Sequence, residues 1–309
     1  MAIRIFYKNL RMLELEERQR FERGSLIEVI NPSTEEIEHL HKKLSVDSSL
    51  IHDALDPYEV PRLESSGNDL YVFLRYPIKE NGVISTIPLL IIIADKFLML
   101  VTLREFDLIG ELNRTLEDIA TTQKTKLVLQ ILSRMHRQYK LYLNDINRQV
   151  NSLSIRARGE RIDNSDIMSF IGFEDTLNDF ISALIPYSSI LHRLVDGRNL
   201  KLFNDDKDLI EDLILGSEEL IQLSKNSLNT SINIRDAYST VLTNTLNRVI
   251  KFLTSLTIIL TVAVIIPSIY GMNIDLPFQR SPHAFAIVMC ITAGISVFLI
   301  WLFNKKKWL

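Results

Sequence analysis

The sequence predicts a membrane protein with an α/β domain at its N-terminus, a long α-helical stalk and two transmembrane helices at its C-terminus. Three observations support this fold class. Residues 252–274 and 281–304 contain no charged side chain, and each stretch is long enough as a helix to cross about 30 Å of hydrocarbon. Strand-like patterns occur only before about residue 104. The chain between about 124 and 246 follows a helical period.

Charge is distributed unevenly along the 309 residues. Lys plus Arg number 35 and Asp plus Glu number 38, a net charge of −3 that argues against a protein that coats nucleic acid. Residues 247–309 carry six basic side chains against Asp275 alone, so the preceding residues carry a net charge of −8. Cys290 is the only cysteine, which rules out an intrachain disulfide and fits a reducing compartment.

The first hundred residues alternate between strand and helix signals. Asn31-Pro32 reads as a helix start, with a capping side chain followed by proline at the first helical position. Asp95-Lys96 reads as the turn of a β-hairpin. In chain order we expect strands at Arg4–Lys8 and Leu26–Ile30, helices at 31–44 and 46–55, and strands at Leu70–Tyr76, Val83–Ala94 and Phe97–Thr102.

Three long helices are expected to follow. Apolar residues recur about once per turn through Lys124–Arg158, a helical pattern covers Asp163–Val195, and a third helix begins near Asp205. This third helical pattern runs directly into the first membrane span, and Gly216 is the only residue that argues against a continuous helix. It predicts a helix of roughly 60 residues and about 90 Å, which needs packing partners along its length.

The expected domains are residues 1–123 (α/β), 124–246 (helical, including the stalk) and 247–309 (the membrane hairpin), with spans at about 249–270 and 283–303. Basic residues indicate the orientation, because Arg248 and Lys251 precede the first span and Lys305–Lys307 follow the second. By the positive-inside rule, both termini lie in the cytoplasm and the short loop lies outside. We therefore expect a multi-pass protein of the cell membrane, either an inner or a plasma membrane.

Polar side chains recur every seven residues along the third helix and into the membrane span. They are Asn226, Asn233, Thr240, Asn247, Thr254, Thr261 and Ser268, and a companion line three residues on holds Asn229, Asp236, Thr243, Ile250, Thr257 and Val264. A period of seven keeps both lines on one seam of a helix bundle, and polar groups are costly where they face lipid. The alternative for any single Ser or Thr is a hydrogen bond back to its own helix.

The seam predicts a water-filled pore. Because one hairpin cannot enclose water, such a pore requires a ring-shaped homo-oligomer. Apolar residues near the seam, namely Ile250, Leu253 and Val264, are candidates for constrictions that gate by excluding water. The residues expected to line the pore are Asn247, Ile250, Thr254, Thr257, Thr261, Val264 and Ser268.

The first span ends in the motif Tyr270-Gly271-Met272-Asn273. At the outer end of the first of two C-terminal membrane helices, this motif resembles the CorA family of magnesium transport proteins. The tail Lys305-Lys306-Lys307-Trp308-Leu309 and the segment from Asp56-Pro57 to Arg62, followed by an aromatic strand, are similar to that family as well. The resemblance therefore covers essentially the whole chain.

The resemblance implies a homopentameric, funnel-shaped channel with Gly271, Met272 and Asn273 as its selectivity motif. A ring of Asn273 amides at the outer mouth suits Mg²⁺, which gives up its waters reluctantly and is better bound through its hydration shell. No enzymatic activity and no cofactor are implied, and magnesium is both the transported and the regulatory ion. By their distance from the motif, Asp212 and Asp236 match the family's acidic positions for regulatory magnesium, and Asp236 also falls on the polar seam.

Two departures from the family pattern bear on the ion. Family loops commonly carry Met-Pro-Glu-Leu where this chain has Ile274–Gln279, with Asp275 as its only acid, and family pores often have Met and Gly where this chain has Thr261 and Ser268. A related zinc-transporting branch usually changes the middle residue of the motif. Met272 is retained here, which favours magnesium, with cobalt and nickel as secondary ions.

Three functions compete at this stage: a passive magnesium channel, a transporter of zinc or another transition metal with the same architecture, and a signalling or scaffold protein that the hairpin only tethers. The polar seam argues against the tether, since an anchor has no need of it. No Gly is followed by Lys, so the chain lacks a phosphate-binding loop and ATP-driven transport is not expected. The expected partners are divalent metal ions, further copies of the chain and the lipid bilayer.

Overall fold

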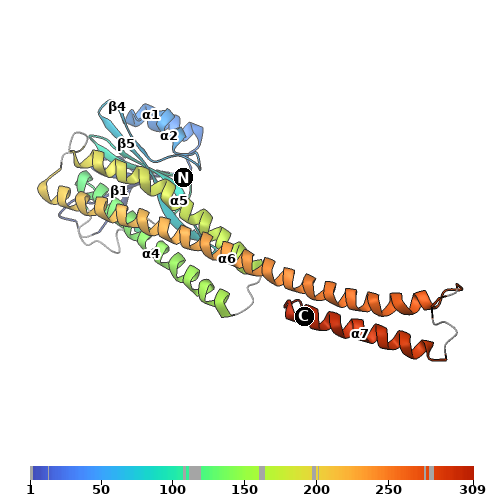
Figure 1. Ribbon diagram of the computed structural model, residues 1–309. Helices are drawn as coiled ribbons and strands as arrows, with labels where there is room; N and C mark the ends of the chain where they lie inside the picture. The colour runs from blue at the N-terminus through green and yellow to red at the C-terminus, as the bar shows by residue number, and fades with distance from the viewer. Residues whose placement is uncertain are drawn as a thin grey trace. The chain divides into compact units, whose positions relative to one another are not determined.

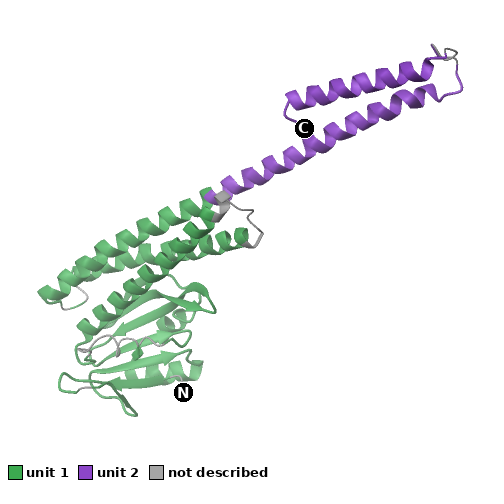
Figure 2. Cartoon of the chain, turned by 90° about the horizontal axis from the view of Figure 1, so that it is seen from below, with its two compact units in different colours: residues 1–233 green, residues 234–309 purple. Residues whose placement is uncertain are grey.

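The computed structural model describes residues 3–12, 14–106, 109–110, 120–159, 164–196, 200, 202–274, 276–277 and 282–309. It divides into two compact units, residues 1–233 and 234–309, which Figure 2 draws in green and purple. One helix, α6 (Asn204–Tyr270), belongs to both units. The domain boundaries expected at residues 123 and 246 stay predictions.

The first unit is built on a seven-stranded sheet with the order β2-β1-β3-β7-β6-β5-β4. Figure 1 labels β1, β4 and β5 of this sheet. Neighbouring strands are antiparallel except β3 and β7, which pair in parallel. The expected hairpin around Asp95-Lys96 is confirmed, because Ile93 of β6 lies opposite Leu98 of β7. The strands are β1 (Ile3–Tyr7), β2 (Glu16–Arg18), β3 (Ser25–Ile30), β4 (Arg62–Ser66), β5 (Asp69–Glu80), β6 (Val83–Ile93) and β7 (Phe97–Thr102).

Both faces of the sheet centre are covered. Alternate residues of β6 and β7, such as Leu90, Ile92 and Met99, join one core cluster with the helices α1 (Thr34–Leu44) and α2 (Ser48–Asp53). The residues between them, such as Ile91 and Leu100, point to the other face, because side chains alternate along a strand, and they are also buried. The long helices α4 and α5 contact β5 and β6. Burial on both sides explains why these strands read as continuous apolar runs.

The expected start of the first helix was wrong. α1 spans Thr34–Leu44 and its N-cap is Ser33, whereas Asn31 and Pro32 precede it, with Asn31 at φ 43°. The Ser33 side chain accepts a hydrogen bond from the backbone N–H of Glu36 at 3.3 Å, and the Glu36 carboxylate accepts one from the backbone N–H of Ser33 at 2.9 Å. This reciprocal capping box satisfies two backbone donors, which a lone Asn31 cap would not.

The second helix, α2 (Ser48–Asp53), is shorter than the expected 46–55, because Asp47 caps it by accepting from the N–H of Ser49 at 3.0 Å. Two strands were not expected at all. β2 and β4 are edge strands with few buried side chains, so they lack the apolar alternation that marks a strand in the sequence.

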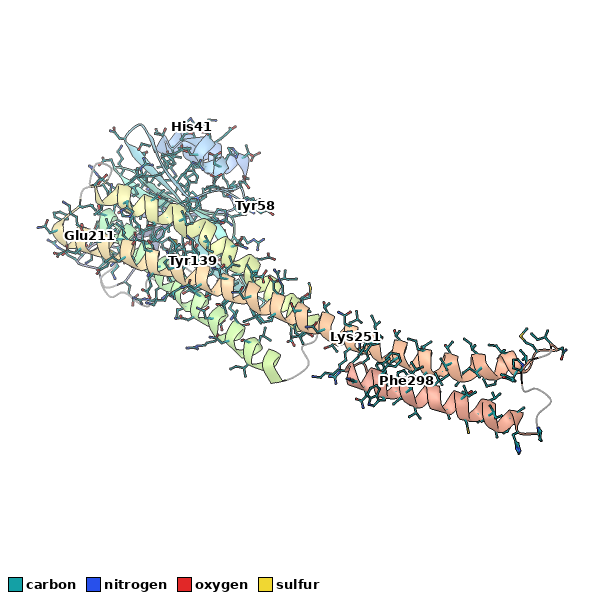
Figure 3. All side chains as sticks on the ribbon, in the orientation of Figure 1. His41, Tyr58, Tyr139, Glu211, Lys251 and Phe298 are labelled. Atoms are coloured by element: carbon teal, nitrogen blue, oxygen red, sulfur yellow. The ribbon has the colours of Figure 1, made fainter. Side chains whose placement is uncertain are left out.

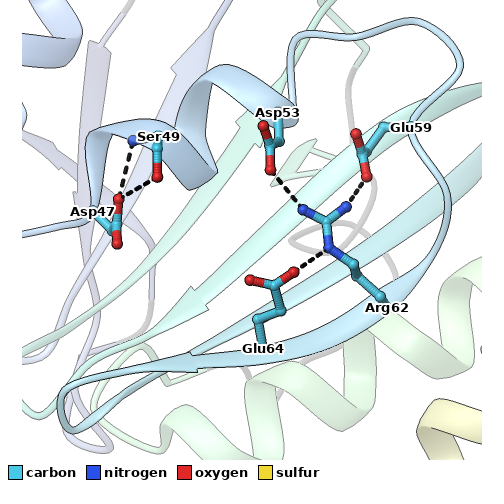
Figure 4. A network of polar contacts seen from close by, with 6 residues as sticks. All are labelled: Asp47, Ser49, Asp53, Glu59, Arg62 and Glu64. Atoms are coloured by element: carbon cyan, nitrogen blue, oxygen red, sulfur yellow. Dashed lines mark hydrogen bonds and ion pairs between the residues drawn. The ribbon is translucent and has the colours of Figure 1, made fainter.

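Arg62 of β4 ties this edge of the sheet to its neighbours (Figure 4). Its guanidinium forms ion pairs with Asp53 at 2.7 Å and with Glu59 and Glu64. It also lies over the ring of Phe73, 3.9 Å from the centroid. The segment between Asp56 and Arg62 is thereby held as a structural turn.

Long helices complete the chain: α4 (Lys124–Gly159), α5 (Asn164–Val195), α6 (Asn204–Tyr270) and α7 (Ala284–Lys305). The three helices expected from Lys124, Asp163 and Asp205 are confirmed to within a residue at their starts. α6 has 67 residues, which corresponds to about 100 Å of helical rise.

Tyr139 anchors α4 to the sheet and to α5 (Figure 3). Its hydroxyl donates to the backbone carbonyl of Arg75 in β5 at 2.7 Å, and its ring packs edge-on against Phe180 of α5 with centroids 4.9 Å apart. The side chain is buried, and desolvation raises the pKa of its hydroxyl well above the usual range. Tyr139 therefore stays a neutral hydrogen-bond donor.

The first half of α6 packs on α4 and α5 through an unusual line of serines. Ser217, Ser224, Ser227 and Ser231 are all buried, and they follow Ile210 and Leu213 at helical spacing. The Ser227 hydroxyl donates to the Asn147 side chain of α4, and the Ser231 hydroxyl donates to the Glu174 carboxylate of α5 at 3.4 Å. Two of these serines thus link α6 to α4 and α5 by side-chain hydrogen bonds.

Gly216 marks the tightest point of this packing. A Cβ on Gly216 would lie 2.6 Å from Cε1 and 2.7 Å from Nε2 of His136 on α4. Burial, reinforced by Lys140 and opposed by Glu219, holds the pKa of His136 below its usual value. The imidazole therefore packs as a neutral ring against the bare helix backbone.

We expect Gly216→Ala to loosen the contact between α4 and α6 by about 1–3 kcal/mol, the usual cost of an added methyl in a packed site. Amide hydrogen exchange of the α4 and α6 segments in the full-length protein measures the loosening as lost protection. The matched control is Gly172→Ala in α5, where a new Cβ meets nothing within 4 Å and should stabilise the helix by about 0.5–1 kcal/mol. Equal protection in the two variants would contradict the assigned role of Gly216.

Candidate functional site

The second unit holds the candidate site. The C-terminal half of α6 and most of α7 are long and apolar enough to cross a membrane, and few residues of these stretches are buried within the chain. A core helix of a soluble protein would be mostly buried. The exposure of these two stretches therefore agrees with the two spans expected from the sequence.

One face of each membrane helix packs on the other. Within the second unit α6 and α7 run antiparallel and side by side (Figures 1 and 2). Ser255 of α6 is fully buried, and Val288, Thr292 and Phe303 of α7 are each 8% exposed. The Ser255 hydroxyl donates to the Phe252 carbonyl at 2.8 Å, so no polar hydrogen is left without an acceptor at this contact.

The seven expected pore-lining residues all lie exposed on α6. Ile250 is 51% and Val264 63% exposed, and Asn247, Thr254, Thr257, Thr261 and Ser268 are exposed as well. At about 100° per residue, this seam is centred roughly 140° around the helix from the line through Ser255 and Ile259. Within one chain, the seam therefore faces away from α7.

Two threonines of the seam bond back to their own helix. The Thr257 hydroxyl donates to the Leu253 carbonyl at 2.8 Å, and the Thr261 hydroxyl donates to the Thr257 carbonyl at 2.7 Å. The alternative considered for single threonines thus holds for these positions. Each hydroxyl oxygen still has lone pairs on the exposed face, where water can use them and a lipid tail cannot.

The motif follows directly on α6. The backbone N–H of Gly271 donates to the carbonyls of Pro267 at 3.0 Å and Ser268 at 3.2 Å, so the helix closes before Met272 and Asn273, both of which are exposed. A Cβ on Gly271 would make only ordinary contacts, the nearest at 3.4 Å. Within one chain, a side chain at position 271 would therefore meet no steric obstacle.

The loop beyond the motif is described only in part. The Tyr270 hydroxyl donates to the carbonyl of Pro277 at 3.2 Å, which ties the end of α6 to the loop. Asp275, the acid expected to attract cations, and Arg280 lie outside the described residues.

The two aspartates matched to regulatory positions lie apart on α6. Both Asp212 and Asp236 are exposed, and Asp236 is 3.7 Å from the guanidinium of its neighbour Arg235. They are 24 residues apart along one helix, or about 36 Å of helical rise. Among the described residues no group of three or more His, Cys, Asp or Glu side chains is placed to hold a metal ion.

The face of α6 that packs on α7 is not apparent from the sequence. Ser255, Ile259, Val262 and Ile266 form this face at helical spacing. Because nearly every residue of the span is apolar, the pattern carries no contrast that would distinguish this face. Only the polar seam stands out against it.

Comparisons with known proteins agree with this arrangement. A protein-family model described as CorA-like Mg²⁺ transporter protein matches residues 24–306. The cobalt/magnesium transport protein CorA of Methanocaldococcus jannaschii is 25% identical over 293 residues, which is 92% of this chain and 90% of that protein.

Two solved structures cover the whole chain. The complete structure of the CorA magnesium transporter from Methanocaldococcus jannaschii has a TM-score of 0.82 at 23% identity, covering 100% of this chain and 99% of the other. The full-length CmaX protein has a TM-score of 0.75 at 17% identity, covering 100% and 98%. The fold class expected from the sequence is thereby confirmed.

Cysteine labelling tests whether the seam faces water. In a Cys290→Ala background, which removes the only native cysteine, we expect Thr261→Cys to react at least about tenfold faster with a charged, membrane-impermeant thiol reagent than Ile259→Cys. The reason is that the reactive thiolate forms poorly in apolar surroundings. Similar rates at the two positions would show that the seam is no wetter than the face towards α7.

Proposed function

The chain belongs to the family of CorA-like Mg²⁺ transporter proteins, and from this premise we propose that it is a passive channel through which magnesium crosses the cell membrane. Membrane potential alone drives uptake, since moving two charges inward across 100 mV releases about 4.6 kcal/mol. The observation that carries the proposal is the exposed polar seam of α6, which ends at the Gly271-Met272-Asn273 motif.

A ring of chains completes the pore. In each chain the seam faces away from α7, so several copies arranged with α6 innermost would enclose a polar lumen and leave α7 towards lipid. We propose a homopentamer, as the family resemblance implies. Ile250 and Val264, both about half exposed or more, then form apolar rings that exclude water in the closed state.

Asn273 forms the selectivity ring in this proposal. Its side chain follows the last turn of α6 and is exposed, so five amides at one level offer carbonyl oxygens to the waters around an incoming ion. Neutral amides bind a hydrated dication more weakly than carboxylates would, and weak binding permits rapid exit. Met272 is retained between Gly271 and Asn273, which favours magnesium over zinc, with cobalt and nickel as secondary ions.

Orientation follows from charge. Arg248, Lys251 and the lysines 305–307 gather at one end of the two spans, and the positive-inside rule assigns that end to the cytoplasm. Residues 1–246 and the C-terminal end of the chain are then cytoplasmic. The motif faces the outside, where the ion enters.

We expect Asn273→Ala to lose most magnesium flux while the protein assembles as the parent does. The substitution removes the amide ring but leaves the α6–α7 contact and the seam intact. Flux of magnesium, cobalt and zinc into proteoliposomes measures transport, and native mass spectrometry in mild detergent measures assembly. Parent-like magnesium flux would overturn the selectivity assignment, and a parent protein that is monomeric would overturn the pore itself.

The regulatory proposal concerns Asp212 and Asp236. Both are exposed on α6, and among the described residues neither belongs to a group of three or more His, Cys, Asp or Glu side chains placed to hold a metal ion. In the proposed oligomer, the adjacent chain supplies the remaining ligands. Asp236 also lies on the seam, where five copies repel one another unless a cation neutralises them. An ion that binds only the closed arrangement stabilises it by about 2.7 kcal/mol at a hundredfold excess over its Kd.

The double variant Asp212→Asn with Asp236→Asn should lose most of the protection that millimolar magnesium gives against proteolysis of the cytoplasmic part. It should also conduct at magnesium concentrations that close the parent. The control is Asp208→Asn with Glu211→Gln, which removes two exposed acids from the same helix. Identical protection curves for the parent and the double variant would contradict the proposed magnesium sensor but not the proposed channel.

A further inference from the structure

A groove of about 480 Å³ lies in the second unit, where the two membrane helices carry their basic residues. It is lined by Arg248, Val249 and Phe252 of α6 and by Asn304, Lys307, Trp308 and Leu309 at the end of the chain. We propose that this groove binds the phosphate headgroup of an anionic phospholipid. The proposal requires that the two helices span a membrane, but it does not depend on which ion the channel carries.

The wall of the groove is a defined turn. Lys307 adopts the left-handed conformation at φ 56°. The backbone N–H of Trp308 donates to the carbonyl of Phe303 at 2.9 Å, and the backbone N–H of Lys307 donates to the carbonyl of Asn304 at 3.0 Å. These two bonds make a Schellman motif. The Trp308 ring stacks on Phe303, with centroids 5.7 Å apart and planes 6° apart, so the chain folds back onto the end of α7 here.

Charge complementarity identifies the occupant. Arg248 and Lys307 line the groove, and neither forms an ion pair with any residue that the structure describes. Lys251, Lys305 and Lys306 lie close by in the sequence, and from residue 237 to 309 the only acidic side chain is Asp275, beyond the far end of both spans. A guanidinium and an ammonium that converge on one groove suit a phosphate.

The apolar part of the groove distinguishes a lipid from a free anion. Val249, Phe252 and Leu309 supply an apolar floor beside the charged rim, and this floor lies where the uncharged stretch of α6 begins, at residue 252. A phospholipid presents a phosphate at this depth with a glycerol backbone and acyl chains directly below it. Basic pockets between membrane helices on the cytoplasmic side suit such headgroups, and the cytoplasmic leaflet is the anionic one.

Native mass spectrometry of the full-length protein in detergent tests the proposal. Phosphatidylglycerol should remain bound at least about tenfold more tightly than phosphatidylcholine of the same chain length, because a zwitterionic headgroup carries its own ammonium. Glycerol 3-phosphate should not displace it at equal concentration. Displacement by glycerol 3-phosphate would indicate a soluble-anion site, and equal retention of the two lipids would indicate apolar adhesion; either result overturns the proposal.

Two variants locate the site. Arg248→Gln with Lys307→Asn removes both groove charges, and asparagine tolerates the left-handed conformation at position 307, so the preference for phosphatidylglycerol should fall at least about tenfold. The matched control, Lys305→Gln with Lys306→Gln, removes two charges that do not line the groove and should retain most of the preference. If both double variants lost the same share of the preference for phosphatidylglycerol, the basic residues would attract the lipid collectively. That result would contradict a specific site in the groove.

A third variant leaves the charge unchanged. Trp308→Ala removes the stacked ring that forms one wall of the groove, so this variant should also retain phosphatidylglycerol more weakly than the parent. Parent-like retention in Trp308→Ala would contradict a built pocket. Thermal unfolding and oligomeric state, measured for every variant, separate lost binding from lost folding.

Discussion

The structure depends on one continuous hydrogen-bonded helix that has to satisfy two different surroundings. α6 runs for 67 residues without a break, and most of a helix's stability in a protein comes from the packing of its faces rather than from intrinsic helix propensity. Its first half is stabilised by packing of Ile210, Leu213 and the buried serines on α4 and α5. Its second half turns one face to α7 and exposes another. The cytoplasmic packing of α6 and its exposed polar seam therefore belong to one and the same helix.

Much of the architecture could be predicted from the sequence because long periodic segments carry a strong signal. The three long helices and the polar seam depend on patterns that repeat many times, so a single misread residue does not disturb them. Local features were less accessible. Ser33 rather than Asn31 caps α1, since the cap is decided by a reciprocal bond with Glu36 that a residue-type preference does not capture.

For the candidate site, the sequence could predict only those residues whose polarity contrasts with the apolar span around them. Thr261 and Ser268 could be assigned to an exposed face, because their polarity contrasts with the apolar span around them. The face towards α7 could not, since Ile259 and Val262 look like every other apolar residue there. The fold-back of Trp308 was also invisible, because a left-handed lysine at position 307 contradicts the usual preference for glycine at such a turn.

The parallel pairing of β3 with β7 affects how the chain is made. β3 ends at Ile30 and cannot meet its partner until Thr102 has left the ribosome, yet the first uncharged span begins only at residue 252. At 5–20 residues per second, synthesis of the 150 residues between Thr102 and residue 252 takes roughly 8–30 s. The sheet therefore has time to close, and the apolar residues of β6 and β7 can be buried before the uncharged stretch that starts at residue 252 is made. Delivery to the bilayer then concerns a nascent chain whose N-terminal part is already folded.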